Sequence, residues 1–125
     1  MNVFIKTIPH SQQDYPTVGN WKIEKDGTIF IFVSKMNDWR YEFLVSVHEL
    51  VEVYLCIHSG VRQNTVNRFD MKFEKNRPKG NTDEPGDDEK SPYQIQHSIA
   101  SGVERILAAF IGVSWRKYSA KIDSL

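Results

Sequence analysis

The run SVHELVEVYLC at residues 46–56 places His48, Glu49 and Glu52 among apolar neighbours. Burying an ionisable side chain is costly unless the group is paired, hydrogen-bonded or bound to a metal. The elements that enclose this run must therefore bring polar partners or an ion with them. This requirement limits both the fold and the function of the chain.

The spacing around this run predicts a helix over about 38–59. Asp38 is a favourable N-cap and Gly60 is a favourable stop. On a helical projection, His48 and Glu52 lie one turn apart on a single apolar stripe, and the opposite side is apolar too. We therefore expect the helix to be enclosed on most sides.

A second helix, expected over about 92–111, repeats this pattern. Ser91 and Pro92 suit its start. His97 and Glu104 lie among small and apolar residues on one face, which suggests close approach by a neighbouring element. The two polar-containing stripes are most simply explained if the two helices face each other.

The remaining segments indicate an α+β fold. Residues 1–34 are rich in strand-type runs, and Asp26 with Gly27 predicts a hairpin with a type I′ turn. A short helix is expected over 64–69, and 76–91 reads as an acidic loop. We predict one domain over the full 125 residues: a small antiparallel sheet followed by two principal packed helices.

Composition excludes several classes of protein. Sixteen basic and sixteen acidic residues give a net charge of zero, and the basic residues form no stripe, so nucleic acid is an unlikely partner. No apolar run approaches the roughly 20 residues that span a bilayer. The N-terminal residues do not resemble a signal peptide. The single cysteine, Cys56, permits no internal disulfide, which favours a cytoplasmic location.

The string HELVE has the form H-E-x-x-E and resembles the zincin metallopeptidase motif H-E-x-x-H, with glutamate in place of the second histidine. The resemblance implies a zincin-like layout. In it, zinc or another divalent transition metal would be bound by His48, Glu52 and a third ligand, for which His97 is the candidate. Glu49 would be the catalytic general base.

A longer resemblance covers nearly the whole chain. The segments YPTVGNW, DGTIFIFVS, VHELVE, EPGDD, PYQIQH and VERILA occur in this order. They are similar to a group of small uncharacterised proteins from phages and bacteria. This resemblance implies a compact domain, a phage or mobile-element origin and a location in the host cytoplasm, but no established activity.

Two functions follow as hypotheses. The first is a zinc-dependent hydrolase, in its narrower form a minimal zincin-like peptidase acting on a peptide or protein. The second is a non-catalytic phage-type accessory protein, in which the His/Glu cluster is structural, with or without an ion. Asp70 is expected to be a helix cap rather than a ligand. Whether Glu104 or an acid of the 76–91 loop joins the site stays open, as does the oligomeric state.

Overall fold

The computed structural model describes residues 1–125 and contains three strands and four α-helices. The strands are β1 (Val3–Ile8), β2 (Gly19–Ile23) and β3 (Ile29–Ser34). The helices are α1 (Trp39–Ser59), α2 (Gln63–Lys75), α3 (Gln94–Phe110) and α4 (Trp115–Asp123). Two short 3₁₀ turns, η1 (His10–Gln12) and η2 (Pro85–Asp87), lie in the connections. The chain therefore has the predicted α+β class.

The sheet is mixed, so the prediction of an antiparallel sheet was wrong. The strand order is β1-β3-β2, with β3 antiparallel to β2 but parallel to β1. Ile29, Ile31 and Val33 of β3 are completely buried, whereas Phe4 and Ile5 of β1 are exposed. The most continuously apolar strand thus takes the centre of the sheet, where both of its edges are paired.

The predicted type I′ turn is also absent. Gly27 alone has a positive φ in this hairpin, at 87°, and the connection spans residues 24–28. Glu24 N donates to Thr28 O at 2.8 Å, and the Asp26 carboxylate accepts from Thr28 N at 2.9 Å. The Asp26 side chain thus stabilises a longer turn than the two-residue form that the dipeptide suggested.

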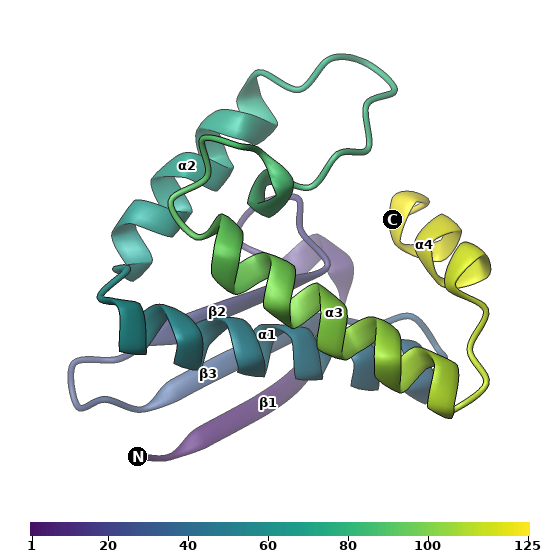
Figure 1. Cartoon of the computed structure of the whole chain (residues 1–125), viewed down its shortest axis with the longest axis horizontal. Helices are drawn as coiled ribbons and strands as arrows, with labels where there is room; N and C mark the ends of the chain where they lie inside the picture. The colour runs from purple at the N-terminus through teal and green to yellow at the C-terminus, as the bar shows by residue number, and fades with distance from the viewer.

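Helix α1 is the middle layer of the molecule (Figure 1). It packs against β2 and β3 on one side and against α3 on the other. Asp38 caps its first turn, because the carboxylate accepts from Arg40 N at 3.0 Å, and Gly60 ends it with φ 72°. The enclosure is less complete than predicted, because Phe43 and Tyr54 remain exposed at its flanks.

Two helix boundaries differ from those expected. Helix α2 continues to Lys75 instead of ending at residue 69, because Val66 and Asp70, one turn apart, are both buried on its inner face. Helix α3 has Tyr93 as its N-cap residue instead of Ser91. None of the helices combines the length and the apolar character needed to cross a membrane.

Candidate metal centre

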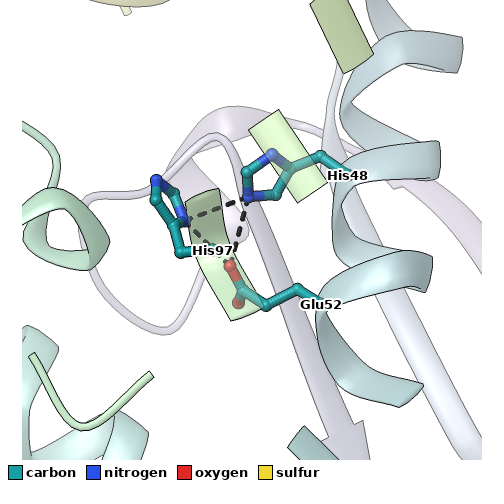
Figure 2. A group of neighbouring side chains, drawn as sticks. All are labelled: His48, Glu52 and His97. Atoms are coloured by element: carbon teal, nitrogen blue, oxygen red, sulfur yellow. Dashed lines mark hydrogen bonds and ion pairs between the residues drawn. The ribbon is translucent and has the colours of Figure 1, made fainter. Parts of the chain in front are cut away.

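Three side chains from α1 and α3 converge at one point between the two helices (Figure 2). His48 Nε2 lies 3.1 Å from Glu52 Oε2, and His97 Nδ1 lies 2.9 Å from the same oxygen. The two nitrogen atoms are themselves 3.1 Å apart. All three residues are buried. The structure therefore brings together the three residues that the sequence singled out as candidate ligands.

The spacing of these three atoms suits a small divalent cation. In a tetrahedral zinc site with ligand bonds of about 2.0–2.1 Å, neighbouring ligand atoms are roughly 3.3 Å apart. The three observed separations are 2.9–3.1 Å, so an ion fits between the atoms after a slight expansion. Three protein ligands leave a fourth position, which is the arrangement of catalytic rather than structural zinc sites.

The second nitrogen of His48 faces a carboxylate. His48 Nδ1 lies 2.8 Å from Glu104 Oε1, and the Tyr118 hydroxyl donates to the other oxygen of Glu104. A carboxylate at this position holds the imidazole as the Nδ1–H tautomer and leaves the Nε2 lone pair free for an ion. Glu104 thus supports the candidate centre from outside.

The second nitrogen of His97 is held in the same way. His97 Nε2 lies 2.9 Å from Glu84 Oε2 and 3.4 Å from Asp87 Oδ1. Both acids belong to the segment that contains η2. Gly86 of that turn lies against the imidazole, since a Cβ atom there would overlap the ring of His97. Glu52, the third candidate ligand, also has an outer partner. The indole N–H of Trp21 donates to Glu52 Oε1 at 3.0 Å, which leaves Oε2 facing the two histidines.

A second group of side chains could also hold a metal ion, because its ligand atoms lie within 4.8 Å of one another: Glu84, Asp87 and His97. A neutral imidazole has one N–H and one lone pair, so His97 can offer its lone pair to only one of the two groups. The side chains of Glu84 and Asp87 are 52% and 61% exposed, whereas those of His48 and Glu52 are 9% and 6% exposed. The buried group is the better candidate, with Glu84 as the acceptor of the His97 N–H.

Buried charge around the centre is unbalanced. No lysine or arginine is buried in this protein. The buried histidines and carboxylates are His48, Glu49, Glu52, Asp70, His97 and Glu104. Carboxylates in a low-dielectric interior need a compensating positive charge. A divalent cation would provide that charge.

Protons provide part of this charge when no ion is bound. Burial alone would lower the pKa of His97, but hydrogen bonds to Glu52 and Glu84 outweigh burial and raise it to about 10. The pKa of His48 is likewise raised, because hydrogen bonds to Glu104 and Glu52 outweigh its burial. A metal ion and these protons would therefore compete for the same nitrogen atoms.

Glu49 lies beside the centre without belonging to it. Its carboxylate makes no hydrogen bond and lines a cleft of about 340 Å³ together with the three candidate ligands. The side chain lies against Gly19 at the start of β2, where a Cβ atom would come within 2.5 Å of Glu49 Oε1. Burial first, and then the charge of Glu52, raise the pKa of Glu49 to about 8. A free carboxylate with a raised pKa is suited to accept and return a proton.

Asp70 is neither a cap nor a member of the cluster. It lies in the middle of α2, so the expectation that it caps a helix was wrong. Its two oxygens accept hydrogen bonds from the hydroxyls of Tyr15, at 2.8 Å, and Tyr93, at 2.6 Å. Burial raises the pKa of Asp70 to about 6. The two tyrosines satisfy this carboxylate without an ion.

Several supporting residues were not identified from the sequence. Glu84 and Asp87 belong to the acidic loop over 76–91, for which the sequence left open whether any acid reaches the site, and it singled out neither residue. Trp21 and Tyr118 carried no signal that links them to the centre. Their contacts depend on how β2 and α4 pack, and no short motif records that.

No family model matches this chain, and neither a curated protein nor a solved structure matches it. The zincin and phage resemblances therefore gain no support from these comparisons.

Proposed function

We propose that the protein is a metal-dependent hydrolase with a zincin-like centre. In this proposal His48, Glu52 and His97 bind zinc or another divalent transition metal, and Glu49 is the general base. One observation carries the proposal: both histidines turn one nitrogen towards the same Glu52 oxygen, and each has a separate carboxylate on its other nitrogen. This is the arrangement that outer carboxylates impose on metal-binding histidines.

The roles of the residues follow from their chemistry. A cation held by this set would lower the pKa of a bound water towards 7 and polarise a carbonyl group. Glu49 would take a proton from the attacking water and return it to the leaving amine. Two histidines and one carboxylate form a ligand set that open zinc sites commonly use, so Glu52 is compatible with the proposal despite its departure from H-E-x-x-H.

The cleft favours a peptide or amide substrate. Its volume of about 340 Å³ lies in the range of small-molecule and peptide side-chain pockets. Gly19, Asn20 and Trp21 of the edge strand β2 line the cleft beside the candidate ligands, and an edge strand can pair with an extended peptide chain. We place the activity in the cytoplasm, which would be the host cytoplasm for a phage-encoded protein. The lone cysteine supports this location.

A turnover measurement on Glu49→Gln tests the catalytic part of the proposal. Zinc-loaded wild type, Glu49→Gln and Glu89→Gln would be compared on a panel of fluorogenic peptides and simple amides. Glu89 is an exposed loop residue, so its variant is the matched control. We expect Glu49→Gln to lower kcat by roughly 10²–10⁴-fold with unchanged zinc content. Equal turnover in all three proteins would exclude Glu49 as the base.

A second candidate function is a non-catalytic accessory protein that keeps the same ion as a structural element. The exposed apolar face of α3, described below, favours this alternative, because such faces are typical of interaction surfaces. It predicts that zinc binds and stabilises the protein while wild type and Glu49→Gln are equally inactive.

A further inference from the structure

The outer face of α3 carries large apolar side chains that no other element covers. Ile95, Ile99, Ile106 and Phe110 are 70%, 49%, 71% and 88% exposed. The inner face of the same helix carries the buried His97, and the helix packs on α1 (Figure 1). The four exposed side chains lie on its opposite face, by their helical spacing from His97. This surface, named here the α3 stripe, is independent of the proposed hydrolase.

The spacing of the stripe is that of a helix–helix seam. Residues 95, 99, 102 and 106 are separated alternately by four and three positions, which is the a/d pattern of paired helices, and Phe110 follows Ile106 by one helical turn. Gly102 and Ala109 are small and exposed, and a Cβ atom at Gly102 would meet nothing within 4 Å. The stripe therefore has room for a second helix to approach closely at its middle.

The size of the stripe matches a small but specific interface. Fully exposed side chains of this size present on the order of 200 Å² each. From their exposed fractions, the four residues offer roughly 500 Å² on one copy, or about 1,000 Å² for two copies. That total reaches the lower limit for a biological interface. On one copy, the stripe has the size of the largest apolar patch on a typical monomer, about 300–600 Å², and such patches are often functional.

We propose that two copies of this chain form a two-fold dimer in which their α3 stripes pack antiparallel. The stripe has a large side chain at each end, Ile95 and Phe110, and Gly102 near its middle. In antiparallel pairing that sets Ile95 of one copy beside Phe110 of the partner subunit, Ile99 lies beside Ile106 of the partner subunit, and the Gly102 positions of the two copies meet near the two-fold axis. The helix dipoles then also oppose each other favourably.

The charge pattern favours a second copy over a charged partner. Apart from the inward-facing Glu104, Arg105 at the edge of the stripe is the only aspartate, glutamate, lysine or arginine in α3. An uncharged, self-complementary stripe suits an isologous contact, in which the same surface serves both subunits. One arginine at its edge is fewer than the several lysines and arginines that hold an amphipathic helix on an anionic membrane.

Sedimentation measurements on the full chain, from about 1 to 100 µM, test the dimer. We expect wild type to associate to a dimer and Ile106→Glu to remain a monomer. Met71→Glu is the control, because Met71 is an exposed apolar residue on α2, 48% exposed against 71% for Ile106, and this variant should still dimerise. Circular dichroism would check that each variant is folded, which is expected because the altered side chains are exposed.

A mixing experiment tests the orientation. Ile95→Glu and Phe110→Lys should each weaken self-association at least tenfold, because each charge then faces an apolar end of the partner. In an antiparallel pair of the two different variants, the glutamate meets the lysine and the intact ends meet each other. We therefore expect the equimolar mixture to recover dimer that neither variant forms alone.

Four outcomes would overturn the inference. A wild-type chain that stays monomeric at about 100 µM would remove the dimer. A dimer that Ile106→Glu leaves intact would place the interface elsewhere. A dimer that the single variants weaken but their mixture does not restore would exclude antiparallel pairing. Monomeric wild type that binds phosphatidylcholine vesicles would assign the stripe to a lipid surface instead.

Discussion

At the scale of single residues, the candidate centre depends on which nitrogen of each histidine is free. Glu104 accepts from His48 Nδ1, so the lone pair is left on the nitrogen that faces Glu52. The same logic assigns Glu84 to His97. The outer carboxylates therefore decide whether the inner three atoms can bind an ion, although none of them needs to touch it.

Replacing Glu104 with glutamine tests this dependence. The side chain keeps its size but loses its charge, so it polarises His48 less and can turn its amide N–H₂ towards the ring. We expect zinc affinity to fall by roughly 10–100-fold, which is typical for a lost outer carboxylate. Competition with a chromophoric chelator would measure it. Tyr118→Phe removes only the hydroxyl behind Glu104 and should weaken zinc binding less. Equal affinity in wild type and Glu104→Gln would contradict this role.

The inner residues were predictable from the sequence, while the outer ones were not. His48 and Glu52 are four residues apart on one helix, and that spacing alone places them together. His97 was predictable because its helix repeats the same combination of polar and apolar residues. Glu84 reaches the centre only through the turn at Gly86, and the sequence cannot show that a loop acid returns to a buried ring.

At the scale of elements, two glycines set how closely the walls approach the centre. Gly86 brings η2 onto the ring of His97, and Gly19 brings the start of β2 onto the carboxylate of Glu49. A side chain at either position would displace a different functional group. Under the proposed mechanism, the two positions would therefore separate metal binding from proton transfer.

We expect Gly86→Ala and Gly19→Ala to fail in different ways. In Gly86→Ala the new methyl group pushes η2 or His97 aside, so zinc content and melting temperature should both fall. In Gly19→Ala the methyl group displaces Glu49, so zinc should be retained while kcat falls by about 10²-fold, as expected for a reacting group moved by about 1 Å. Elemental analysis and peptide turnover would be measured on both. Loss of zinc from Gly19→Ala would show that Glu49 supports the ion directly.

Sequence signals within one segment, such as helix caps, predicted the secondary-structure elements well. The predictions that were wrong depend on contacts between segments far apart in the sequence. Asp38 and Gly60 define α1 because caps act within one turn of the helix. The parallel pairing of β1 with β3 joins segments more than twenty residues apart, and no local pattern distinguishes it from antiparallel pairing. Helix α2 extends beyond the predicted end because Asp70 finds tyrosine partners on other elements.

At the scale of the whole molecule, buried titratable groups make stability depend on pH. His97 has its pKa raised from 6.5 to about 10, so its contribution is complete below pH 6.5 and is lost as the pH rises through 10. Glu49 has its pKa raised from 4.5 to about 8, so it also favours the folded state less as the pH rises through that range. Glu52 acts oppositely, because its pKa is lowered from 4.5 to about 2, so its contribution is complete above pH 4.5 and is lost as the pH falls through 2.

The metal-free protein should therefore melt at a lower temperature as the pH rises from about 6.5 to 9. Zinc binding should become stronger as the pH rises, because a higher pH removes the protons that compete with zinc for the histidine nitrogens. The increase in melting temperature caused by zinc should then grow over the same range. Scanning fluorimetry in a pH series, with zinc and with chelator, would measure both. A metal-free melting temperature that rises with pH would contradict these pKa assignments.

The central claim is that the buried cluster binds an ion, and elemental analysis of natively purified protein tests it most directly. His48→Ala and His58→Ala would be analysed in parallel, since His58 is an exposed histidine on the same helix. We expect about one divalent transition-metal ion per chain in wild type and His58→Ala, and almost none in His48→Ala. Chelation should lower the wild-type melting temperature by roughly 10 °C. Wild-type protein without stoichiometric metal, whose melting curve neither zinc nor chelator moves, would show that the cluster is held by hydrogen bonds alone.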